Sequence, residues 1–263
     1  MSLKWAINGI LDDIYFYAQG LPRLLVTWKP ENELSILNFF ESNVKKYPNE
    51  IAFIFKDQEI TWKEADSKVT HYGAFLQEKG IKPGDCFALL MDNCPDFLML
   101  LLAAHRIGAI AALINTTVTG EGLKHVVTIA DAKAVILGAS HLDKFNSSMP
   151  ESELNSLDLF LIEDSKKIPN DYIDINKASK ESTKIETHRL KIKDVAMYIY
   201  TSGTTGLPKA ALITNGRAIK TSYAGQFFGF RAKQKDILYL TLPLYHATGL
   251  LLSLIHISEP TRP

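Results

Sequence analysis

Hydrophobic residues recur along this chain with two different periods. Short apolar runs at 51–55 and 59–61 flank the polar turn KDQ, a pattern that predicts two strands in a hairpin. Thr61 then opens TWKE, a capping box in which the glutamate three residues on can return a hydrogen bond. Apolar residues follow at helical spacing, namely Ala65, Val69, Tyr72 and Leu76. We therefore expect an amphipathic helix that ends at Gly80.

The same change of period repeats downstream of that helix. Strand-like runs at 86–91 and 109–114 enclose a helix-like run at 96–107, and a helix near 120–130 precedes a strand at 133–138. Strands that alternate with helices in this way predict a parallel sheet with helices on both faces. The fold class is therefore expected to be α/β, built from βαβ units whose sheet is covered by helices.

Two apolar stretches are candidates for membrane contact. The run 97–114 carries His105 and Arg106 in its middle and Gly108 just after them, which favours a buried helix, a glycine stop and a buried strand over a membrane span. At the start of the chain, two aspartates interrupt the apolar residues 1–25 before they reach the length of a signal or a span. We expect a helix docked on the domain there, with an amphipathic helix on a membrane surface as the alternative.

The second half of the chain starts with a change of composition. Residues 164–194 are polar, rich in lysine and weakly periodic, so we expect a surface connection. The apolar runs 195–200 and 210–215 then predict two strands. Because only a short loop separates these strands, we expect them to lie side by side in one sheet. Asn215 is a candidate N-cap for a helix that continues to about Phe228.

The composition argues against several classes of function. The chain has 263 residues, of which 46% are hydrophobic and 22% charged, enough for one large or two small domains. Its 29 basic and 29 acidic residues balance, so we expect no nucleic-acid binding. Cys86 and Cys94 form no C-x-x-C pair, and we expect both to be small core residues in a reducing, intracellular compartment. No metal site is expected, because metal-ligand spacing is missing among His71, His105, His125, His141 and His188.

The nine residues TSGTTGLPK, 201–209, are the strongest candidate for chemistry, and they connect two predicted strands. Gly203 and Gly206 permit left-handed backbone angles that let N–H groups converge on phosphate oxygens, and Lys209 adds a mobile positive charge. Hydroxyl groups supply further donors, from Thr201, Ser202, Thr204 and Thr205. Pro208 before the lysine excludes a Walker A loop, and the dinucleotide pattern G-x-G-x-x-G does not fit either. The alternative is an ordinary turn rich in Ser, Thr and Gly.

The stretch YIYTSGTTGLPKAALITN resembles the adenylate-forming enzymes, a family that includes acyl-CoA synthetases, luciferases and the adenylation domains of peptide synthetases. A second segment, LPLYHATGL at 242–250, is similar to the next motif of that family. The stretch from FALLMDN to LKHVV, 87–127, resembles the long- and very-long-chain acyl-CoA synthetase or fatty acid transport protein branch. The resemblance covers roughly residues 34–253 and implies an incomplete N-terminal domain of the adenylate-forming fold.

The resemblance implies a reaction in two steps. A carboxylate attacks the α-phosphate of ATP to give acyl-AMP and pyrophosphate, and the thiol of CoA then displaces AMP to give a thioester. The loop and Tyr200 before it would hold the β- and γ-phosphates, while Mg²⁺ would share their charge. His246, as the catalytic residue, and Tyr245 would lie near the carboxylate and the acyl entrance; for His246 a core histidine is the alternative. The implied activity is that of a long- or very-long-chain fatty acid–CoA ligase.

After the second motif the chain departs from the family pattern. The segments that contact adenine, ribose and Mg²⁺, and the small domain with the catalytic lysine, are not found in these 263 residues. We therefore expect an N-terminal docking segment at 1–33, a partial AMP-binding domain at 34–253, a non-native tail at 254–263, and no activity from the chain alone. A strand at 237–242 and the apolar residues 247–257 would then leave a sheet edge and an apolar face exposed.

Other functions stay open at the level of sequence. The chain could be a non-catalytic fragment or regulatory isoform that binds only nucleotide or a membrane surface. It could also belong to an adenylating enzyme for another carboxylic acid, such as an aryl or medium-chain acid. Peripheral association with the endoplasmic reticulum, peroxisomal or plasma membrane is a further expectation.

Overall fold

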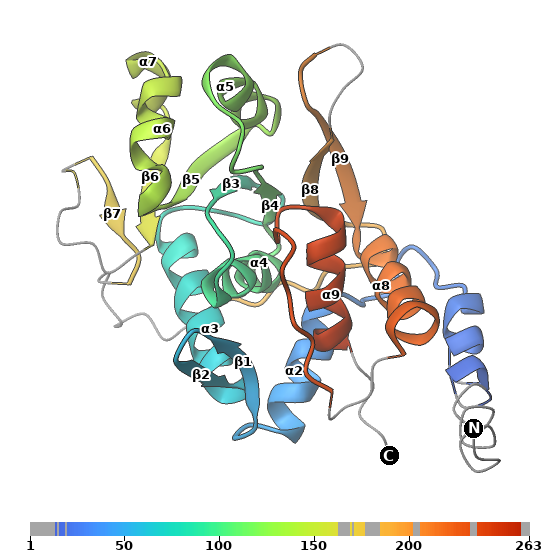
Figure 1. The fold of residues 1–263 in the computed structure, drawn as a ribbon. Helices are drawn as coiled ribbons and strands as arrows, with labels where there is room; N and C mark the ends of the chain where they lie inside the picture. The colour runs from blue at the N-terminus through green and yellow to red at the C-terminus, as the bar shows by residue number, and fades with distance from the viewer. Residues whose placement is uncertain are drawn as a thin grey trace, which may run out of the picture.

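A computed structural model describes residues 14, 16–18, 20–162, 169, 171–176, 185–201, 206–231 and 236–258. Within these residues a seven-stranded sheet has the order β7-β6-β5-β3-β4-β8-β9 (Figure 1). Its strands are β3 (Cys86–Leu90), β4 (Ile110–Leu113), β5 (Ala132–Gly138), β6 (Asp158–Ile162), β7 (Ile173–Asp174), β8 (Val195–Thr201) and β9 (Lys209–Thr214). A separate hairpin consists of β1 (Ile51–Phe55) and β2 (Gln58–Thr61).

Neighbouring strands of the sheet run parallel from β7 to β8, and only β8 and β9 are antiparallel. A parallel strand in the middle of such a sheet is covered on both faces and therefore needs apolar residues throughout. The five residues of β3, CFALL, meet that requirement and all are buried. The α/β class expected from the alternating periods is confirmed.

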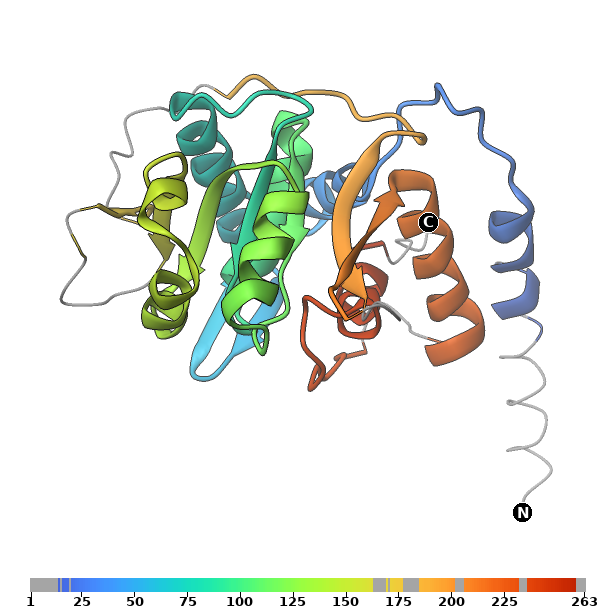
Figure 2. The same cartoon turned by 90° about the horizontal axis from the view of Figure 1, so that it is seen from above.

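Helices cover both faces of the sheet (Figures 1 and 2). On one side of the sheet, a shared core includes residues of α2 (Ile36–Lys46), α3 (Trp62–Glu78), α4 (Pro95–Ile107), α8 (Asn215–Ala224) and α9 (Ala247–Ser258), where α2 and α9 pack mainly on the other helices. The other face packs against α5 (Gly120–Ile129), α6 (Leu142–Ser148) and α7 (Glu151–Leu154). The pleat of β3 shows the division, because Phe87 and Leu89 join the first core whereas Ala88 and Leu90 join the second.

Several local predictions are confirmed in detail. Thr61 accepts a hydrogen bond from the Glu64 amide at 3.2 Å, and the Glu64 carboxylate accepts one from the Thr61 amide at 2.8 Å, which completes the capping box. Gly108 ends α4 in the left-handed conformation with φ +75°. The predicted hairpin of 195–200 with 210–215 is present, with Thr201 paired to Lys209.

The start of α8 corrects one expectation. Thr214, not Asn215, caps the helix, since its side chain accepts the hydrogen bond of the Arg217 amide. Asn215 is fully buried, and its amide group donates to the Lys191 carbonyl at 3.1 Å. The helix also ends earlier than expected, at Ala224, and a π-helical turn over Gly225–Phe230 continues it.

The predictions for residues 237–257 were wrong. Residues 236–241 form no strand, and Ile237 and Tyr239 are 83% and 87% exposed. A strand needs a partner for its backbone groups, and none of the described strands pairs with this segment. The apolar residues after it are not exposed as a face, because α9 buries Leu250, Leu254, Ile255 and Ile257 against α2 and α8.

Helix α9 also crosses the boundary expected at residue 254. The side-chain amide of Asn43 in α2 donates to the Ile257 carbonyl at 3.0 Å, so residues just past the boundary are bonded to the domain. The proposed tail at 254–263 stays a prediction, and residues 259–263 lie outside the described part of the chain.

The polar stretch 164–194 is more than a surface connection. Where the structure describes it, the stretch adds β7 to the edge of the sheet and buries Tyr172, Ile175 and Leu190. These three apolar side chains stand among lysines and serines, so their local pattern is too weak to predict the contact.

The N-terminal helix, described at residues 14, 16–18 and 20–25, contacts the turn after α8. The Phe16 side chain is buried, with its ring centroid 6.3 Å from that of Phe227. The Tyr17 ring lies 5.6 Å from that of Phe228, and the side of the helix away from these contacts exposes Ile14, Leu21 and Leu25. The helix thus packs on the domain through its aromatic residues, and the membrane alternative concerns its exposed side. Among the described helices, none is long and apolar enough to span a bilayer.

Candidate functional site

The carboxyl ends of β3, β4, β5, β6 and β8 lie at one edge of the sheet. At this edge α4, which follows β3, and α5, which follows β4, leave for opposite faces of the sheet. Two neighbouring strands whose connections diverge in this way open a crevice between their carboxyl ends, where open α/β sheets bind ligands. Both sequence motifs reach this edge.

The loop 201–209 leaves the sheet at this edge and returns to it. Thr201 ends β8, Lys209 starts β9, and the two residues pair across the antiparallel ladder. Gly206 has φ +100°, the left-handed conformation expected for it. Four of the predicted phosphate-binding residues, Ser202, Gly203, Thr204 and Thr205, lie outside the described residues.

The described ends of the loop offer donors that suit a polyphosphate. The side chains of Thr201 and Lys209 are exposed, and among the described residues no carboxylate forms an ion pair with Lys209. Its positive charge is therefore available to a ligand. The described residues contain no group of three His, Cys, Asp or Glu side chains placed to hold a metal ion.

Tyr200, the residue before the loop, has an internal role in this structure. Its hydroxyl donates a hydrogen bond to the Val126 carbonyl of α5 at 2.6 Å. Burial is the main reason why the pKa of this hydroxyl lies above its usual range. The side chain therefore anchors β8 to α5, and direct contact of Tyr200 with a nucleotide stays a prediction.

The second motif is positioned by Asn93, in the turn between β3 and α4. Its side-chain amide donates to the Leu242 carbonyl and its side-chain oxygen accepts from the Leu244 amide, both at 2.8 Å. Tyr245 and His246 follow directly, with Tyr245 half-buried and His246 exposed. The exposure of His246 argues against the alternative of a core histidine.

The structure brings the two motifs to the same edge, but not onto adjacent strands. Asn93 follows β3 and Thr201 ends β8, and β4 lies between them. Strands are spaced at about 4.8 Å, so the two attachment points are about 10 Å apart across the sheet. That separation suits a ligand with two recognised ends, such as a nucleotide phosphate at one motif and an acid at the other.

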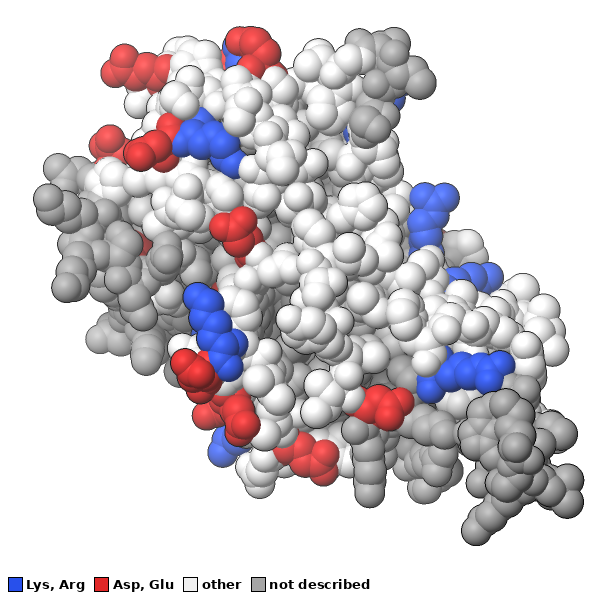
Figure 3. Space-filling view, viewed as in Figure 1, with Lys and Arg blue, Asp and Glu red and all other residues white. Residues whose placement is uncertain are grey.

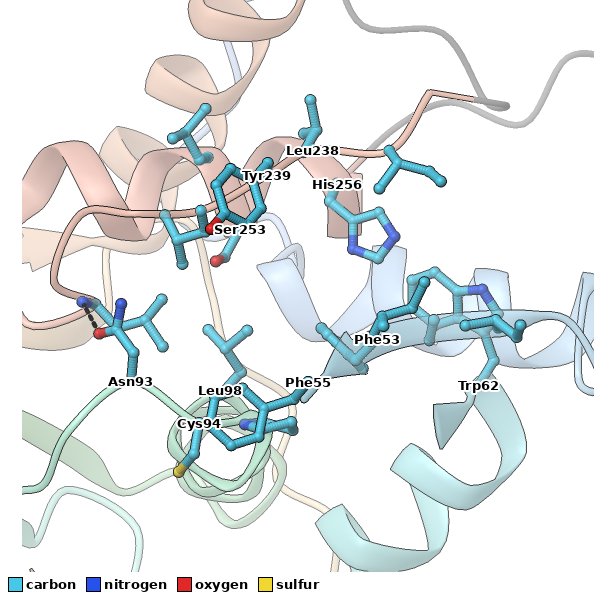
Figure 4. A pocket seen from close by; sticks show the side chains of 18 of the residues that line it. Phe53, Phe55, Trp62, Asn93, Cys94, Leu98, Leu238, Tyr239, Ser253 and His256 are labelled. Carbon is cyan, nitrogen blue, oxygen red and sulfur yellow. Dashed lines mark hydrogen bonds between the residues drawn. The ribbon is translucent and has the colours of Figure 1, made fainter. Parts of the chain in front are cut away.

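A cavity of about 730 Å³ extends from Asn93 between the β1–β2 hairpin, the start of α4 and α9 (Figure 4). Its walls are largely apolar, with Phe55, Leu98 and Cys94 on one side and Tyr239, Ser253 and His256 on the other. The face that carries α9 has few charges at its centre (Figure 3). A site of this size and lining suits an apolar ligand.

Glu50, Lys56 and Asp236 are charged residues of the cavity lining, whereas His256 and Cys94 are uncharged. His256 stacks on Trp62 with ring centroids 5.2 Å apart, and burial lowers its pKa to about 4, so its imidazole is neutral near pH 7. Burial also raises the pKa of the Cys94 thiol to about 11. Cys94 is only half-buried and stands at the N-cap position of α4 without a side-chain capping bond, which corrects the expectation of a core residue, whereas Cys86 is buried as expected.

Two residues of this edge were not among the predicted site residues. Asn93 holds the second motif, and its signal was a polar side chain in the turn that follows a buried strand of a parallel sheet. His125 of α5 contacts the Pro208 carbonyl at 3.1 Å. In the sequence, His125 was considered only as a metal ligand, and this contact requires no metal-ligand spacing.

Comparison with known proteins identifies the family of the chain. Residues 40–258 match the sequence model of the AMP-binding enzymes. The chain belongs to this family. Over 222 residues it is 31% identical to the medium/long-chain-fatty-acid–CoA ligase FadD6 of Mycobacterium tuberculosis. These residues cover 84% of this chain and 36% of that protein. Over 254 residues it is 30% identical to human long-chain fatty acid transport protein 6, and the aligned residues cover 92% of this chain and 40% of that protein.

These matches place the chain in the fatty acid branch of the adenylate-forming superfamily, and the chain spans less than half the length of both relatives. Solved structures of the family share the fold. The anthranilate CoA ligase AuaEII, solved with anthranoyl-AMP, superimposes with a TM-score of 0.75 at 20% identity over 87% of this chain and 44% of that one. The o-succinylbenzoate CoA synthetase of Bacillus subtilis, solved with ATP and magnesium ion, has a TM-score of 0.67 at 22% identity, with 84% and 54% covered.

Proposed function

We propose that this chain contributes the phosphate-binding and acid-binding part of a fatty acid–CoA ligase. The observation that carries the proposal is that the loop 201–209 and the Tyr245–His246 motif leave the same edge of one sheet, beside its diverging connections. ATP, a fatty acid and CoA are the substrates in this proposal. The reaction class follows from the family, and the fatty acid from the relatives of this branch.

In this proposal the loop holds the β- and γ-phosphates of ATP. Lys209 supplies a positive charge that is free of described carboxylates, and the left-handed Gly206 lets backbone N–H groups turn toward the phosphates. Mg²⁺, when bound, would neutralise phosphate charge and make pyrophosphate a better leaving group.

The carboxylate of the acid is proposed to bind beside Tyr245 and His246, and His246 is the proposed catalytic residue. The alkyl chain would extend past Asn93 into the cavity, against Phe55 and Leu98. Transfer of a methylene group from water to such a wall is worth about 0.8 kcal/mol. The neutral side chain of His256 adds no charge that would oppose this transfer.

A membrane surface is the proposed source of the fatty acid. The N-terminal helix turns the apolar side chains of Ile14, Leu21 and Leu25 outward, and a helix with this pattern can lie in the interface of a bilayer. Peripheral association through this side, at the endoplasmic reticulum, peroxisomal or plasma membrane, is part of the proposal.

The proposal is tested by the affinity of the 263-residue chain for Mg²⁺–ATP. We expect Thr204→Ala combined with Lys209→Ala to weaken binding by one to a few decades, because each charge-assisted contact contributes about 1.5–3 kcal/mol. Isothermal titration calorimetry measures the affinity. The matched control is Lys45→Ala, an exposed lysine near the end of α2, which should leave the affinity unchanged.

Equal affinity of the double variant and the wild type would contradict the phosphate assignment. A second arm tests the acid site, where a palmitate-like acid should change the fluorescence of Trp62 in the cavity wall. We expect the chain alone to bind both ligands without forming a thioester, since the adenine, ribose and lysine contributions of the family are not among its motifs. Thioester formation above background would contradict that last expectation.

A further inference from the structure

We infer that His125 of α5 is a positioning residue that, together with Tyr200, holds the two ends of the loop 201–209 in place for phosphate binding. The inference rests on the proposed function of this loop. It concerns a helix on the face of the sheet opposite α4 and α9, which neither sequence motif includes.

The first contact lies at the end of the loop. The His125 side chain is 3.1 Å from the Pro208 carbonyl through Nε2. A carbonyl oxygen only accepts hydrogen bonds, so Nε2 must carry the proton and donate it. Pro208 directly precedes Lys209, and the bond therefore restrains the peptide from which the lysine side chain projects.

The second contact lies at the start of the loop. The Tyr200 hydroxyl donates to the carbonyl of Val126, the residue next to His125. Two consecutive residues of α5 thus hold the two ends of the loop. Val126 bonds to the residue before Thr201, and His125 bonds to the residue before Lys209. Figure 1 shows α5 alongside the hairpin β8–β9.

Helix α5 is a firm support for these contacts. Leu123, Val126 and Val127 are buried in the core on this face of the sheet. The hairpin itself is weakly held, because β9 is an edge strand whose six residues, all described, are half-buried or exposed. A hairpin paired on one side only needs support from outside the sheet if its loop is to keep one geometry, and such preorganisation increases affinity for a ligand.

The test compares side chains that can and cannot replace Nε2. In His125→Gln the amide nitrogen can reach the position of Nε2, whereas in His125→Asn it reaches only that of Nδ1. We expect His125→Ala and His125→Asn to weaken binding of magnesium tripolyphosphate to the 263-residue chain about three- to tenfold, and His125→Gln to restore most of the affinity. Tyr200→Phe should weaken binding to a similar extent.

Matched controls come from the opposite edge of the sheet. His71 contacts the Ile175 carbonyl through Nε2 at 3.0 Å, and the Tyr172 hydroxyl donates to the Asn146 side chain. The variants His71→Ala and Tyr172→Phe remove bonds of the same kind away from the loop. They should lower the melting temperature about as much as the test variants and leave tripolyphosphate affinity unchanged.

Amide hydrogen exchange supplies a readout that needs no ligand. Loss of the contacts should speed exchange in residues 206–211 for His125→Ala and Tyr200→Phe, but not for His71→Ala. Unchanged exchange in this segment, or unchanged affinity of His125→Ala beside a wild type that binds, would overturn the inference. Failure of the wild type itself to bind tripolyphosphate would instead remove the proposed function, and the exchange data would still decide whether α5 supports the loop.

Discussion

The parallel centre of the sheet and the hairpin β8–β9 share one hydrogen-bonded sheet but differ in burial. All residues of β3 are buried, whereas the residues of β9 are half-buried or exposed. The centre is covered by helices on both faces, so its residues are selected for packing. The hairpin ends in a loop whose exposed Thr201 and Lys209 are free to meet a ligand. One sheet therefore contains a buried, stable centre and an accessible loop. Because the two are separate, substitutions in the loop leave the packing of the core unchanged.

The largest expected effect tests this difference directly. Ile136→Ala in β5 removes a fully buried side chain from the centre and should lower the free energy of unfolding by about 2–5 kcal/mol. Leu212→Ala in β9 removes a side chain that is 55% exposed and should change it by less than about 1 kcal/mol. Urea denaturation followed by circular dichroism measures both. Equal losses would break the comparison.

We expect acid to lower the free energy of unfolding through the buried histidines. Burial lowers the pKa of His105 and of His256 to about 4, from 6.5 for a free imidazole. Both are neutral when folded and bind protons more readily when unfolded. The free energy of unfolding is therefore at its full value above pH 6.5 and decreases as the pH falls toward 4, by on the order of 3 kcal/mol for each group. His105→Leu should flatten this slope in denaturation curves between pH 7 and 4.

If His105→Leu kept the full acid slope of the wild type, the buried imidazoles would not be its cause.

A smaller effect is expected where the centre contributes to the site. Asn93→Ala removes both hydrogen bonds to the segment before Tyr245 and should lower the free energy of unfolding by about 1–2 kcal/mol. It should also weaken binding of a palmitate-like acid, but not of magnesium tripolyphosphate. Calorimetry with each ligand separates the two. Asn93→Asp keeps the acceptor for the Leu244 amide, loses the donor to Leu242, and should lie between wild type and Asn93→Ala.

The local elements were predictable wherever the signal was itself local. The capping box Thr61–Glu64 and the glycine stop at Gly108 depend on residues within one turn, and both appear as expected. The exact cap of α8 was missed by one residue, because Thr214 and Asn215 are both good cap residues and only the buried contact of Asn215 with Lys191 separates them.

The predictions that failed depended on distant neighbours. Residues 237–242 are an apolar, strand-like run but form no strand, since strand formation requires a partner and none of the described strands pairs with them. The apolar residues of α9 were expected to be exposed, yet α2 and α8, more than twenty residues away in sequence, cover them.

The α/β class and the hairpin that carries the loop could be inferred from the amino-acid pattern, because burial periodicity and glycine conformation act over a few residues. Three features became apparent only in the folded chain: both motifs reach one edge of the sheet, Asn93 holds the second motif, and His125 lies against Pro208. The physical reason is that strand order and helix packing join residues about 80 to 150 positions apart, as in His125 with Pro208 and Asn93 with Leu244, and no local pattern encodes such pairs.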